Sequence, residues 1–448
     1  MHKIERLLQT LAPKGVGFRK LGEIGEYIRG VTYRKNQEIN NLECGIKVLR
    51  ANNITLSNHL NFEDIKVINK NVKIRKEQYL KKNDILICAG SGSSEHIGKV
   101  AFINTDFDYV FGGFMGVIRI REINSRFVYH IFTSNIFKQY LEKSLNTTTI
   151  NNLNANILQN FLIPIPPLEI QQEIVKILDA FTELNTELNT ELNARKKQYE
   201  YYQNMLLDFN DINQSHKDAK ERLTQKTYPK RLKTLLQTLA PKGVGFRKLG
   251  EIGEYIRGVT YRKNQEINNL ECGIKVLRAN NITLSNHLNF EDIKVINKNV
   301  KIRKEQYLKK NDILICAGSG SSEHIGKVAF INTDFDYVFG GFMGVIRIRE
   351  INSRFVYHIF TSNIFKQYLE KSLNTTTINN LNANILQNFL IPIPPLEIQQ
   401  EIVKILDQFS LLTTDLLAGI PAEIKARKKQ YEYYREKLLT FKPLQNKE

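Results

Sequence analysis

The sequence is poor in cysteine and has no long apolar segment. Its four cysteines lie in 448 residues without a CxxC pair, which argues against a disulfide scaffold or a zinc site. No apolar run approaches the roughly 18–20 residues that span a bilayer. The first six residues lack the apolar core of a signal peptide. We therefore expect a protein that works in a reducing cytoplasm.

The charge, in contrast, is strongly positive. Lys and Arg number 64 against 46 Asp and Glu, so the formal net charge is +18. This excess favours a polyanionic partner, most simply nucleic acid. Apolar residues make up 42% of the chain, which is enough to bury real cores. The length suggests two to four domains, at roughly 100–200 residues per domain.

The chain consists mainly of two copies of one unit. Residues 7–179 recur without a change at 235–407, an offset of 228 residues (235 − 7), and a repeat of this length holds a whole domain. A related segment, 194–202, returns as 426–434. The chain is therefore divided into a globular domain at 1–167, a helix at 168–210, a linker at 211–234, a second globular domain at 235–395 and a second helix at 396–448.

A long helix follows each copy. Apolar residues recur in the first at alternating steps of four and three, which is a heptad seam, at Ile170, Ile174, Ile177, Phe181, Leu184 and Leu188. This helix can run to about Phe209. The second has the same steps, but Gly419-Ile420-Pro421 should break or kink it. Short connections favour an antiparallel pair, because a parallel pair would need the linker to run back along the whole helix.

The tetrapeptide Thr-Glu-Leu-Asn occurs three times in the first helix, at 182–193. One interpretation is a repeat left by replication slippage, without further consequence. The other is a ruler whose length changes in steps of four residues. The residue pattern is compatible with both interpretations at once.

The globular part, roughly 17–165, has a mixed pattern. Apolar runs bounded by turn residues predict strands at Ile46–Leu49, Asp84–Cys88, Val100–Ile103, Tyr109–Phe111 and Gly116–Ile120. Helical spacing extends instead over Phe127–Leu145. We predict an α+β protein in which two globular domains are joined by two long helices, which form an antiparallel coiled coil with an approximate twofold.

The Gly-rich segment Gly90–Val100 fails as a nucleotide-binding loop. Five residues separate Gly92 from Gly98, and Val100 stands where Ser or Thr would bind magnesium in a phosphate loop. Glu95 occupies the place of the third Gly in a dinucleotide-binding loop. We therefore do not expect nucleotide hydrolysis.

Other enzyme signatures are missing as well. The Pro-Pro pairs at 166–167 and 394–395 match a helix start rather than a methyltransferase motif. Glu423-Ile-Lys425 is only a fragment of a nuclease pattern, and we interpret it as a solvated helical face. His96 and His130 have no second ligand at metal spacing, so we interpret each as a surface or hydrogen-bonded residue. The sequence predicts no catalytic and no metal-binding residue.

Several segments resemble the specificity subunit of type I restriction-modification systems. Asn146–Leu153 is similar to a polar loop of that family, and Phe161-Leu-Ile-Pro-Ile-Pro-Pro-Leu-Glu-Ile-Gln-Gln-Glu-Ile-Val175 is similar to its Pro-rich helix start. Leu80–Leu86, followed by Ile97-Gly-Lys99, resembles one of its strand pairs, and tetrapeptide repeats in the central helix are a family feature. The order of these motifs, repeated twice, covers nearly the whole chain. The two recognition domains of the family normally differ, whereas here they are identical.

The resemblance implies a non-enzymatic reader of double-stranded DNA. It implies two target-recognition domains on a helical scaffold, where two methyltransferase subunits dock to methylate adenine and restriction subunits join to form an ATP-dependent nuclease. This chain then carries no cofactor, because S-adenosylmethionine, ATP and Mg are expected on the partner subunits, and no membrane is involved. Two other interpretations stay open: a fused methyltransferase or nuclease with unrecognised motifs, and a structural coiled-coil protein.

Four segments of each domain offer groups for DNA contact. Arg29–Lys35 places three cations and an aromatic ring in a Gly-containing turn, and Arg50–Asn53 offers a guanidinium for guanine and amides for adenine edges. Hydroxyls and Lys99 near 91–99 suit phosphates, and 147–152 is a dense donor–acceptor loop. Basic residues are often merely solvated and Asn/Thr-rich loops merely turns. We interpret Phe111–Met115 as core or turn.

The candidate DNA-binding residues are polar or cationic side chains of these four segments. In the first domain they are Arg29, Thr32, Tyr33, Arg34, Lys35, Arg50, Asn52, Asn53, Ser91, Ser93, Ser94, Lys99, Thr147, Thr148, Thr149, Asn151 and Asn152. In the second domain they are Arg257, Thr260, Tyr261, Arg262, Lys263, Arg278, Asn280, Asn281, Ser319, Ser321, Ser322, Lys327, Thr375, Thr376, Thr377, Asn379 and Asn380.

Overall fold

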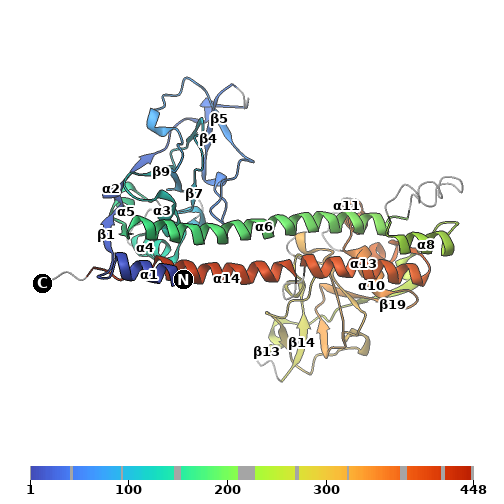
Figure 1. Cartoon of the computed structure of the whole chain (residues 1–448). Coiled ribbons are helices and arrows are strands. Elements are labelled where there is room, and N and C mark those ends of the chain that lie inside the picture. Colours follow the sequence, from blue (N-terminus) through green and yellow to red (C-terminus); the bar gives the residue numbers. More distant parts are fainter. Residues whose placement is uncertain are drawn as a thin grey trace. The chain divides into compact units, whose positions relative to one another are not determined.

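The chain divides into two compact units, which are described separately. The computed structural model in Figure 1 describes residues 2–40, 44–91, 94–145, 153–209, 228–267, 272–319, 322–373, 381–414 and 419–444. Unit 1 joins Met1–Leu188 with Ile424–Glu448, and unit 2 is Asn189–Glu423. Both combine sheets with helices, so the predicted α+β class is confirmed. Within the described ranges, no helix is both long and apolar enough to cross a membrane.

Two four-stranded sheets form the globular part of unit 1. The first has the antiparallel order β2 (Gly25–Arg29), β9 (Met115–Ile120), β6 (Ile85–Cys88) and β7 (Val100–Phe102). The second has the order β3 (Glu38–Ile39), β5 (Lys66–Ile68), β4 (Ile46–Leu49) and β8 (Tyr109–Phe111), with β4 and β8 parallel. All five predicted strands are confirmed, with each end within one residue of the prediction.

The turn at 112–114 connects the two sheets, because β8 of the second sheet leads through it into β9 of the first. Apolar side chains from both sheets share one buried cluster, including Leu49, Leu86, Phe111 and Val117. This core holds both ends of the turn at fixed positions.

Short elements complete the globular part. They are α1 (His2–Leu11), β1 (Gly17–Lys20), α2 (Leu21–Ile24), α5 (Ala155–Asn160) and β10 (Leu162–Ile165). β1 and β10 pair as a separate antiparallel sheet of two strands. β10 leads directly into the long helix that follows.

The segment predicted as one helix over 127–145 forms two. α3 spans Ser125–Phe132 and α4 spans Asn135–Leu145, so the prediction is wrong at its centre. At the break, the Ser134 hydroxyl donates to the carbonyl of Ile131 at 2.6 Å. Such a local bond from a Ser side chain competes with the helical backbone pattern, which sequence spacing alone does not show.

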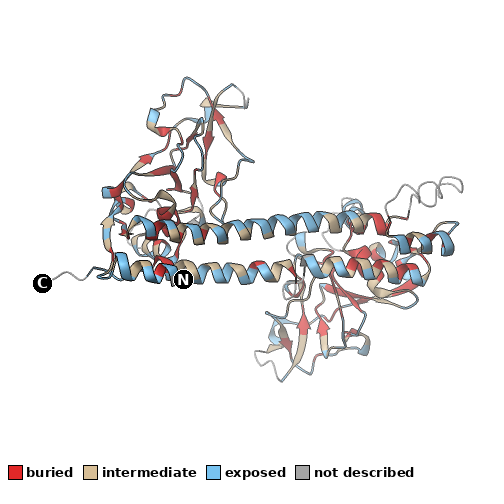
Figure 2. Cartoon of the chain, in the orientation of Figure 1, coloured by how far each residue is buried: buried red, intermediate tan, exposed pale blue. Residues whose placement is uncertain are grey.

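α6 is one continuous helix of 40 residues, Leu168–Leu207, as predicted. Ile170, Ile174 and Leu178 are buried in the core of unit 1, whereas Ile177 is only half-buried. The predicted heptad seam does not include Leu178, because such a seam assumes contact with one partner helix. This end of α6 packs on the globular part as well as on a second helix. None of residues 179–202 is buried, and this stretch contains the repeats at 182–193 (Figure 2).

A polar cluster ties α3 to α6 in unit 1. His130 Nε2 donates to Asp179 Oδ1 at 2.8 Å, and Arg126 Nε donates to the same oxygen at 2.9 Å. Burial lowers the pKa of His130, although the bond to Asp179 raises it. Burial also opposes ionisation of Asp179, but the bonds from His130 and Arg126 outweigh it and lower the pKa of the carboxyl. His130 is thus a buried, hydrogen-bonded residue, as predicted.

The second long helix is interrupted where the sequence predicts a break. α13 spans Leu396–Thr414 and α14 spans Ile420–Leu439. Pro421 is the second residue of α14, where its missing N–H costs no helical bond. α13 lies in unit 2 and the helix from Ile424 onward lies in unit 1.

Within unit 1, α6 and α14 run antiparallel (Figure 1). Phe181 of α6 stacks on Tyr434, with 5.6 Å between ring centroids. Phe441, beyond the end of α14, contacts Phe127 of α3 at 6.3 Å, and the capping residue of α3 binds Gln171 near the start of α6. The later part of α14 therefore lies beside the earlier part of α6.

The chain after α14 also joins unit 1. Val16 donates its backbone N–H to the carbonyl of Lys442 at 2.9 Å, and Leu444 donates to the carbonyl of Val16 at 3.1 Å. Gly15 has a positive φ of 108°, and a Cβ there would lie 2.6 Å from the carbonyl oxygen of Pro443. This close backbone approach explains why the position is glycine.

Unit 2 repeats the same elements in the second copy. They are α8 (Lys230–Leu239), β11 (Gly245–Lys248), α9 (Leu249–Ile252), β12 (Gly253–Arg257), β13 (Glu266–Ile267), β14 (Ile274–Leu277), β15 (Lys294–Ile296), β16 (Ile313–Cys316), β17 (Val328–Phe330), β18 (Tyr337–Phe339), β19 (Met343–Ile348), α10 (Ser353–Phe360), α11 (Asn363–Leu373), α12 (Ala383–Gln387) and β20 (Leu390–Ile393). The sheets have the same strand order as in unit 1.

In each unit, the first part of the long helix that follows the globular domain packs beside the last part of the other long helix. In unit 1, Phe181 of α6 stacks on Tyr434 of α14. In unit 2, Phe409 of α13 stacks on Tyr202 of α6, with 5.1 Å between ring centroids. Phe181 and Phe409 are equivalent in the repeat, and so are Tyr202 and Tyr434. The same contact is thus made twice with the two helices exchanged.

Candidate nucleic-acid interface

Most of the described candidate residues line one pocket. This pocket, here called the basic pocket, has a volume of about 720 Å³ in unit 1. Seven predicted residues line it: Arg29, Thr32, Tyr33, Lys35, Arg50, Asn52 and Ser91. Its copy in unit 2, of about 660 Å³, is lined by Arg257, Thr260, Tyr261, Lys263, Arg278, Asn280 and Ser319. The fold therefore brings together segments some 60 residues apart in sequence.

A close backbone approach builds the pocket. Gly30, just after β2, donates its N–H to the carbonyl of Met115 at 3.1 Å, and Val31 donates to the carbonyl of Phe111 at 2.7 Å. A Cβ at Gly30 would lie only 2.1 Å from the carbonyl oxygen of Gly112. Only glycine allows the chain before Thr32 to lie against the turn that joins the two sheets.

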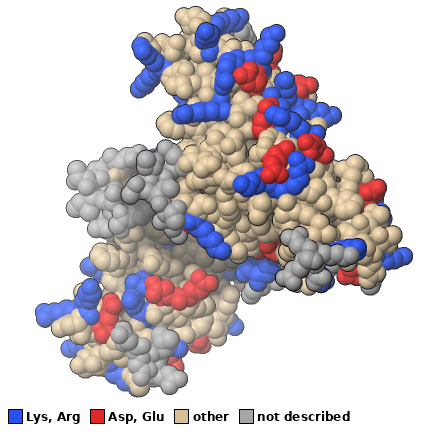
Figure 3. All heavy atoms as spheres, turned by 90° about the vertical axis from the view of Figure 1, so that its left-hand side faces the viewer, with Lys and Arg blue, Asp and Glu red and all other residues tan. Residues whose placement is uncertain are grey.

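The cations of this pocket differ in their partners. Arg29 and Lys35 are exposed, and among the described residues neither forms an ion pair. Arg50 is held by Asp64, with Nη2 and Oδ2 2.7 Å apart, and its buried Nε has no hydrogen-bond partner in the described part of the chain. Lys66 pairs with Glu38 at 3.9 Å. Figure 3 shows Lys and Arg side chains over the part of unit 1 that holds β4 and β5.

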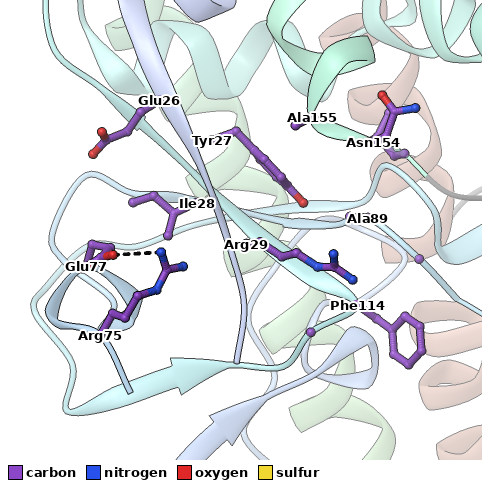
Figure 4. A pocket seen from close by; sticks show the side chains of 13 residues that line it. Glu26, Tyr27, Ile28, Arg29, Arg75, Glu77, Ala89, Phe114, Asn154 and Ala155 are labelled. Carbon is purple, nitrogen blue, oxygen red and sulfur yellow. Dashed lines mark ion pairs between the residues drawn. The ribbon is translucent and has the colours of Figure 1, made fainter. Parts of the chain in front are cut away.

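A second pocket, here called the side pocket, shares Gly113 and Phe114 of the 112–114 turn with the basic pocket. It has a volume of about 640 Å³, and Arg29 and Phe114 line both pockets. Figure 4 shows Arg29 extending along the side pocket toward Phe114. The acidic groups here are neutralised, because Glu77 pairs with Arg75 at 3.1 Å and Glu26 pairs with Arg121 at 2.5 Å.

The tyrosines of the two pockets keep their protons. Burial raises the pKa of Tyr33 in the basic pocket, and the charge of Glu38 raises it further, while Arg50 lowers it. Burial likewise raises the pKa of Tyr27 in the side pocket. Both hydroxyls can therefore donate as well as accept hydrogen bonds at neutral pH.

Two predicted residues have structural roles instead. Asn53 is fully buried; its Oδ1 accepts from the backbone N–H of Arg50 at 2.8 Å and its Nδ2 donates to the carbonyl of Asn61 at 2.9 Å. Lys99 is buried, and its Nζ donates to the carbonyl of Ile54 at 2.8 Å. Burial lowers the pKa of Lys99. We therefore correct the prediction and remove both residues, with their copies Asn281 and Lys327, from the interface.

Other predicted residues stay predictions. Arg34 and Arg262 are exposed beside the basic pocket segment but do not line the pocket. The predicted hydroxyls and amides outside the described residues are Ser93, Thr147, Thr148, Thr149, Asn151, Asn152, Ser321, Thr375, Thr376, Thr377, Asn379 and Asn380. The side chains of Ser94 and Ser322 are likewise not described.

The sequence interpretation missed Phe114. The prediction of core or turn for 111–115 is right for Phe111, which is fully buried, and for the turn itself. The side chain of Phe114, however, is 72% exposed, and that of its copy Phe342 is 73% exposed. The signal that could have indicated this exposed ring is a pair of glycines followed by an aromatic residue between two strands.

The described residues contain no group of three or more His, Cys, Asp or Glu that could hold a metal ion. His96 Nε2 lies 3.7 Å from Glu95 Oε1, which is its one ion pair among the described residues. The chemistry that the pockets offer is hydrogen bonding, cationic contact and an apolar ring, which suits a polyanion with exposed base edges.

Comparison with known proteins agrees with this chemistry. The family model of the type I restriction modification DNA specificity domain matches residues 13–197 and 241–426. A putative type I restriction enzyme specificity subunit from Haemophilus influenzae is 31% identical over 389 residues, covering 83% of this chain and 86% of the relative. The EcoR124I/EcoR124II specificity subunit of Escherichia coli is also 31% identical, over 62% of this chain and 63% of its own.

Solved structures share the fold. The S subunit of a type I restriction-modification system from M. genitalium is similar with a TM-score of 0.52 at 13% identity, over 95% of both chains. A chain from a study of complex assembly and conformational transition of the type I R-M system is similar with a TM-score of 0.53 at 18% identity, over 95% of this chain and 98% of that one.

Proposed function

Because the chain belongs to the family of type I restriction-modification specificity subunits, we propose that it reads a bipartite DNA target for such a complex. The observation that carries the proposal is the basic pocket, which gathers seven predicted DNA-contacting residues in each unit. Arg29 and Lys35, which have no ion pair in the described ranges, suit phosphates. Arg50 and Asn52 have the groups that read guanine and adenine edges.

The two half-sites are identical and inverted, so the target is a palindrome split by a non-specific gap. Identical domains read identical bases, and domains related by a twofold read an inverted repeat. Unit 2 repeats the elements and the strand order of unit 1, which supports equal half-sites.

The chain recognises and scaffolds but does not catalyse. Two methyltransferase subunits, carrying S-adenosylmethionine, methylate adenine on the bound target in the cytoplasm. Restriction subunits, with ATP and Mg, complete the nuclease. The solved relative from a study of type I complex assembly supports this role for the fold.

Methylation mapping tests the proposal. The full chain is expressed with its type I methyltransferase subunit, and methylated adenines are mapped genome-wide. We expect a gapped inverted repeat that disappears when the chain is omitted. Methylation that persists without the chain would contradict the function, and two unrelated half-sites or a direct repeat would contradict the symmetry.

The sequence repeat allows a more specific test, because either domain can be changed alone. Arg50→Ala alone should relax one half-site of the methylated motif, and Arg278→Ala alone should relax the other. The double variant should relax both, at about 1–3 kcal/mol of lost discrimination for each contacted base pair. An unchanged motif in all three would remove Arg50 from base reading.

A further inference from the structure

Phe114 has an exposed aromatic side chain on a turn whose backbone is held by hydrogen bonds. Its ring is 72% exposed, yet its backbone carbonyl accepts hydrogen bonds from the N–H groups of both Ala89 and Gly90, each at 2.9 Å. The turn is closed by the N–H of Met115, which donates to the carbonyl of Gly112 at 2.7 Å. The core strands β8 and β9 hold both ends. The backbone that carries the ring is thus held in place before any partner binds, which reduces the entropy cost of contact.

The surroundings of the ring select the kind of partner. Phe114 lines the basic pocket and the side pocket at once, and Arg29 lines both with it. The acidic residues that line these pockets, Glu26, Glu38 and Glu77, are each paired with a Lys or Arg. An apolar ring between two hollows with unpaired cations suits a partner that has an anionic backbone and flat apolar faces, which is DNA.

We propose that Phe114 and Phe342 are wedges that insert between base pairs of the two half-sites. This inference rests on the proposed function and names a residue that determines how each half-site is bound. Apolar side chains that enter a base step unstack it and kink the duplex. The free energy cost of unstacking depends on the sequence of the base-pair step, and pyrimidine–purine steps unstack most easily. The wedge therefore makes each domain prefer a deformable step at one place in its half-site.

The repeat provides graded variants for a binding test. The full chain with its methyltransferase subunits is titrated with a 40-base-pair duplex that carries the methylated motif. Phe114→Ala should weaken binding about 5- to 150-fold, which corresponds to about 1–3 kcal/mol for one lost stacking contact. Phe114→Ala with Phe342→Ala should weaken it by the product of the two single effects, because the sites are independent.

An equally exposed residue outside both pockets provides the control. Leu56 is 70% exposed and its copy Leu284 is 69% exposed, and neither lines the basic pocket or the side pocket of its unit. Leu56→Ala with Leu284→Ala should bind DNA as the unchanged chain does. Thermal unfolding of all variants checks the fold, which an exposed ring should hardly affect.

Base unstacking distinguishes a wedge from other contacts. Duplexes with 2-aminopurine placed in turn at each adenine of the half-site brighten where the neighbouring stack opens. Apart from the adenine that the methyltransferase subunit flips out of the stack, we expect one bright step per half-site with the unchanged chain and none with the double alanine variant. Phe114→Leu and Phe342→Leu should brighten that step partially, since Leu is also a wedge residue.

Three results would overturn the inference. Alanine variants that bind as tightly as the unchanged chain would exclude a contact. A bright step that lies outside the flipped adenine and persists in the double alanine variant would exclude insertion even if binding were weaker. If the unchanged complex binds no motif duplex, the proposed function fails, and the wedge fails with it.

Discussion

Arg29 and its copy Arg257 offer a quantitative test of the basic pocket. Arg29 is exposed and has no ion pair in the described part of the chain, so we expect each guanidinium to neutralise one phosphate. Each such contact contributes about −0.9 to the slope of log K against log salt concentration. Arg29→Ala with Arg257→Ala should therefore make the slope shallower by about 1.8.

This change in slope has a measurable consequence. Between 50 and 200 mM salt the concentration rises fourfold, and four to the power 1.8 is about 12. The affinity deficit of the double variant should therefore be about 12-fold larger at 50 mM than at 200 mM. The assay is titration of the full complex with a fluorescent motif duplex at four or more salt concentrations.

Arg19 and Arg247 provide a control of equal charge. Arg19 lines neither pocket and pairs with Glu23 and Glu122, at 3.4 and 2.5 Å. Arg19→Ala with Arg247→Ala removes the same net charge, so it measures the effect of overall charge alone. If the Arg29 pair leaves the slope unchanged, or lowers it no more than the control pair does, the basic pocket does not hold phosphates.

Three further outcomes follow from the structure. Deleting one Thr-Glu-Leu-Asn repeat from 182–193 shortens α6 by about 6 Å, so methylation maps should show a gap shorter by about one to two base pairs with unchanged half-sites; a constant gap would contradict the spacer role. Lys99→Met with Lys327→Met should leave the salt slope unchanged and lower the free energy of unfolding in urea by about 1–3 kcal/mol per site, because a buried carbonyl loses its donor. Burial lowers the pKa of His130 and His358, so below pH about 6.5 both take up a proton only on unfolding and the thermal midpoint should fall; His130→Gln with His358→Gln should flatten this pH dependence, and an unaltered curve would refute the assignment.

The fold was largely predictable because local patterns agree with it. The strands are short apolar runs with turn residues at both ends, and the α6 helix begins after a Pro-Pro pair and continues without a break. The break after Phe132 was not predictable, because apolar spacing continues through Ser134 while its hydroxyl bonds backward. The burial of Leu178 was not predicted, because a heptad seam assumes one partner helix, whereas this residue packs on the globular part as well.

The candidate site was predictable in its residue types but not in every side chain's surroundings. Seven residues from three segments do line one pocket. Lys99 is cationic and follows a Gly-rich segment, yet the fold buries its ammonium group against the carbonyl of Ile54. Phe114 lies in the predicted turn, and its ring is directed outward. Both side-chain directions depend on which side of a turn a side chain takes, and that is decided by contacts distant in sequence.

The backbone bonds between Val16 and residues 442–444 set an order for biosynthesis. Unit 2 is a single stretch, Asn189–Glu423, so the whole of it has been synthesised before translation reaches the second part of unit 1, Ile424–Glu448. Unit 1 begins first but lacks α14 and the bonds of Val16 to Lys442 and Leu444 until residues 424–444 have been synthesised. Its closure joins segments more than 400 residues apart, which is a slow and entropically costly step. A ribosome that stops near codon 423 therefore releases a chain with unit 2 whole and with Phe181 of α6 lacking the Tyr434 ring on which it stacks in unit 1, a species suited to capture by chaperones and proteases.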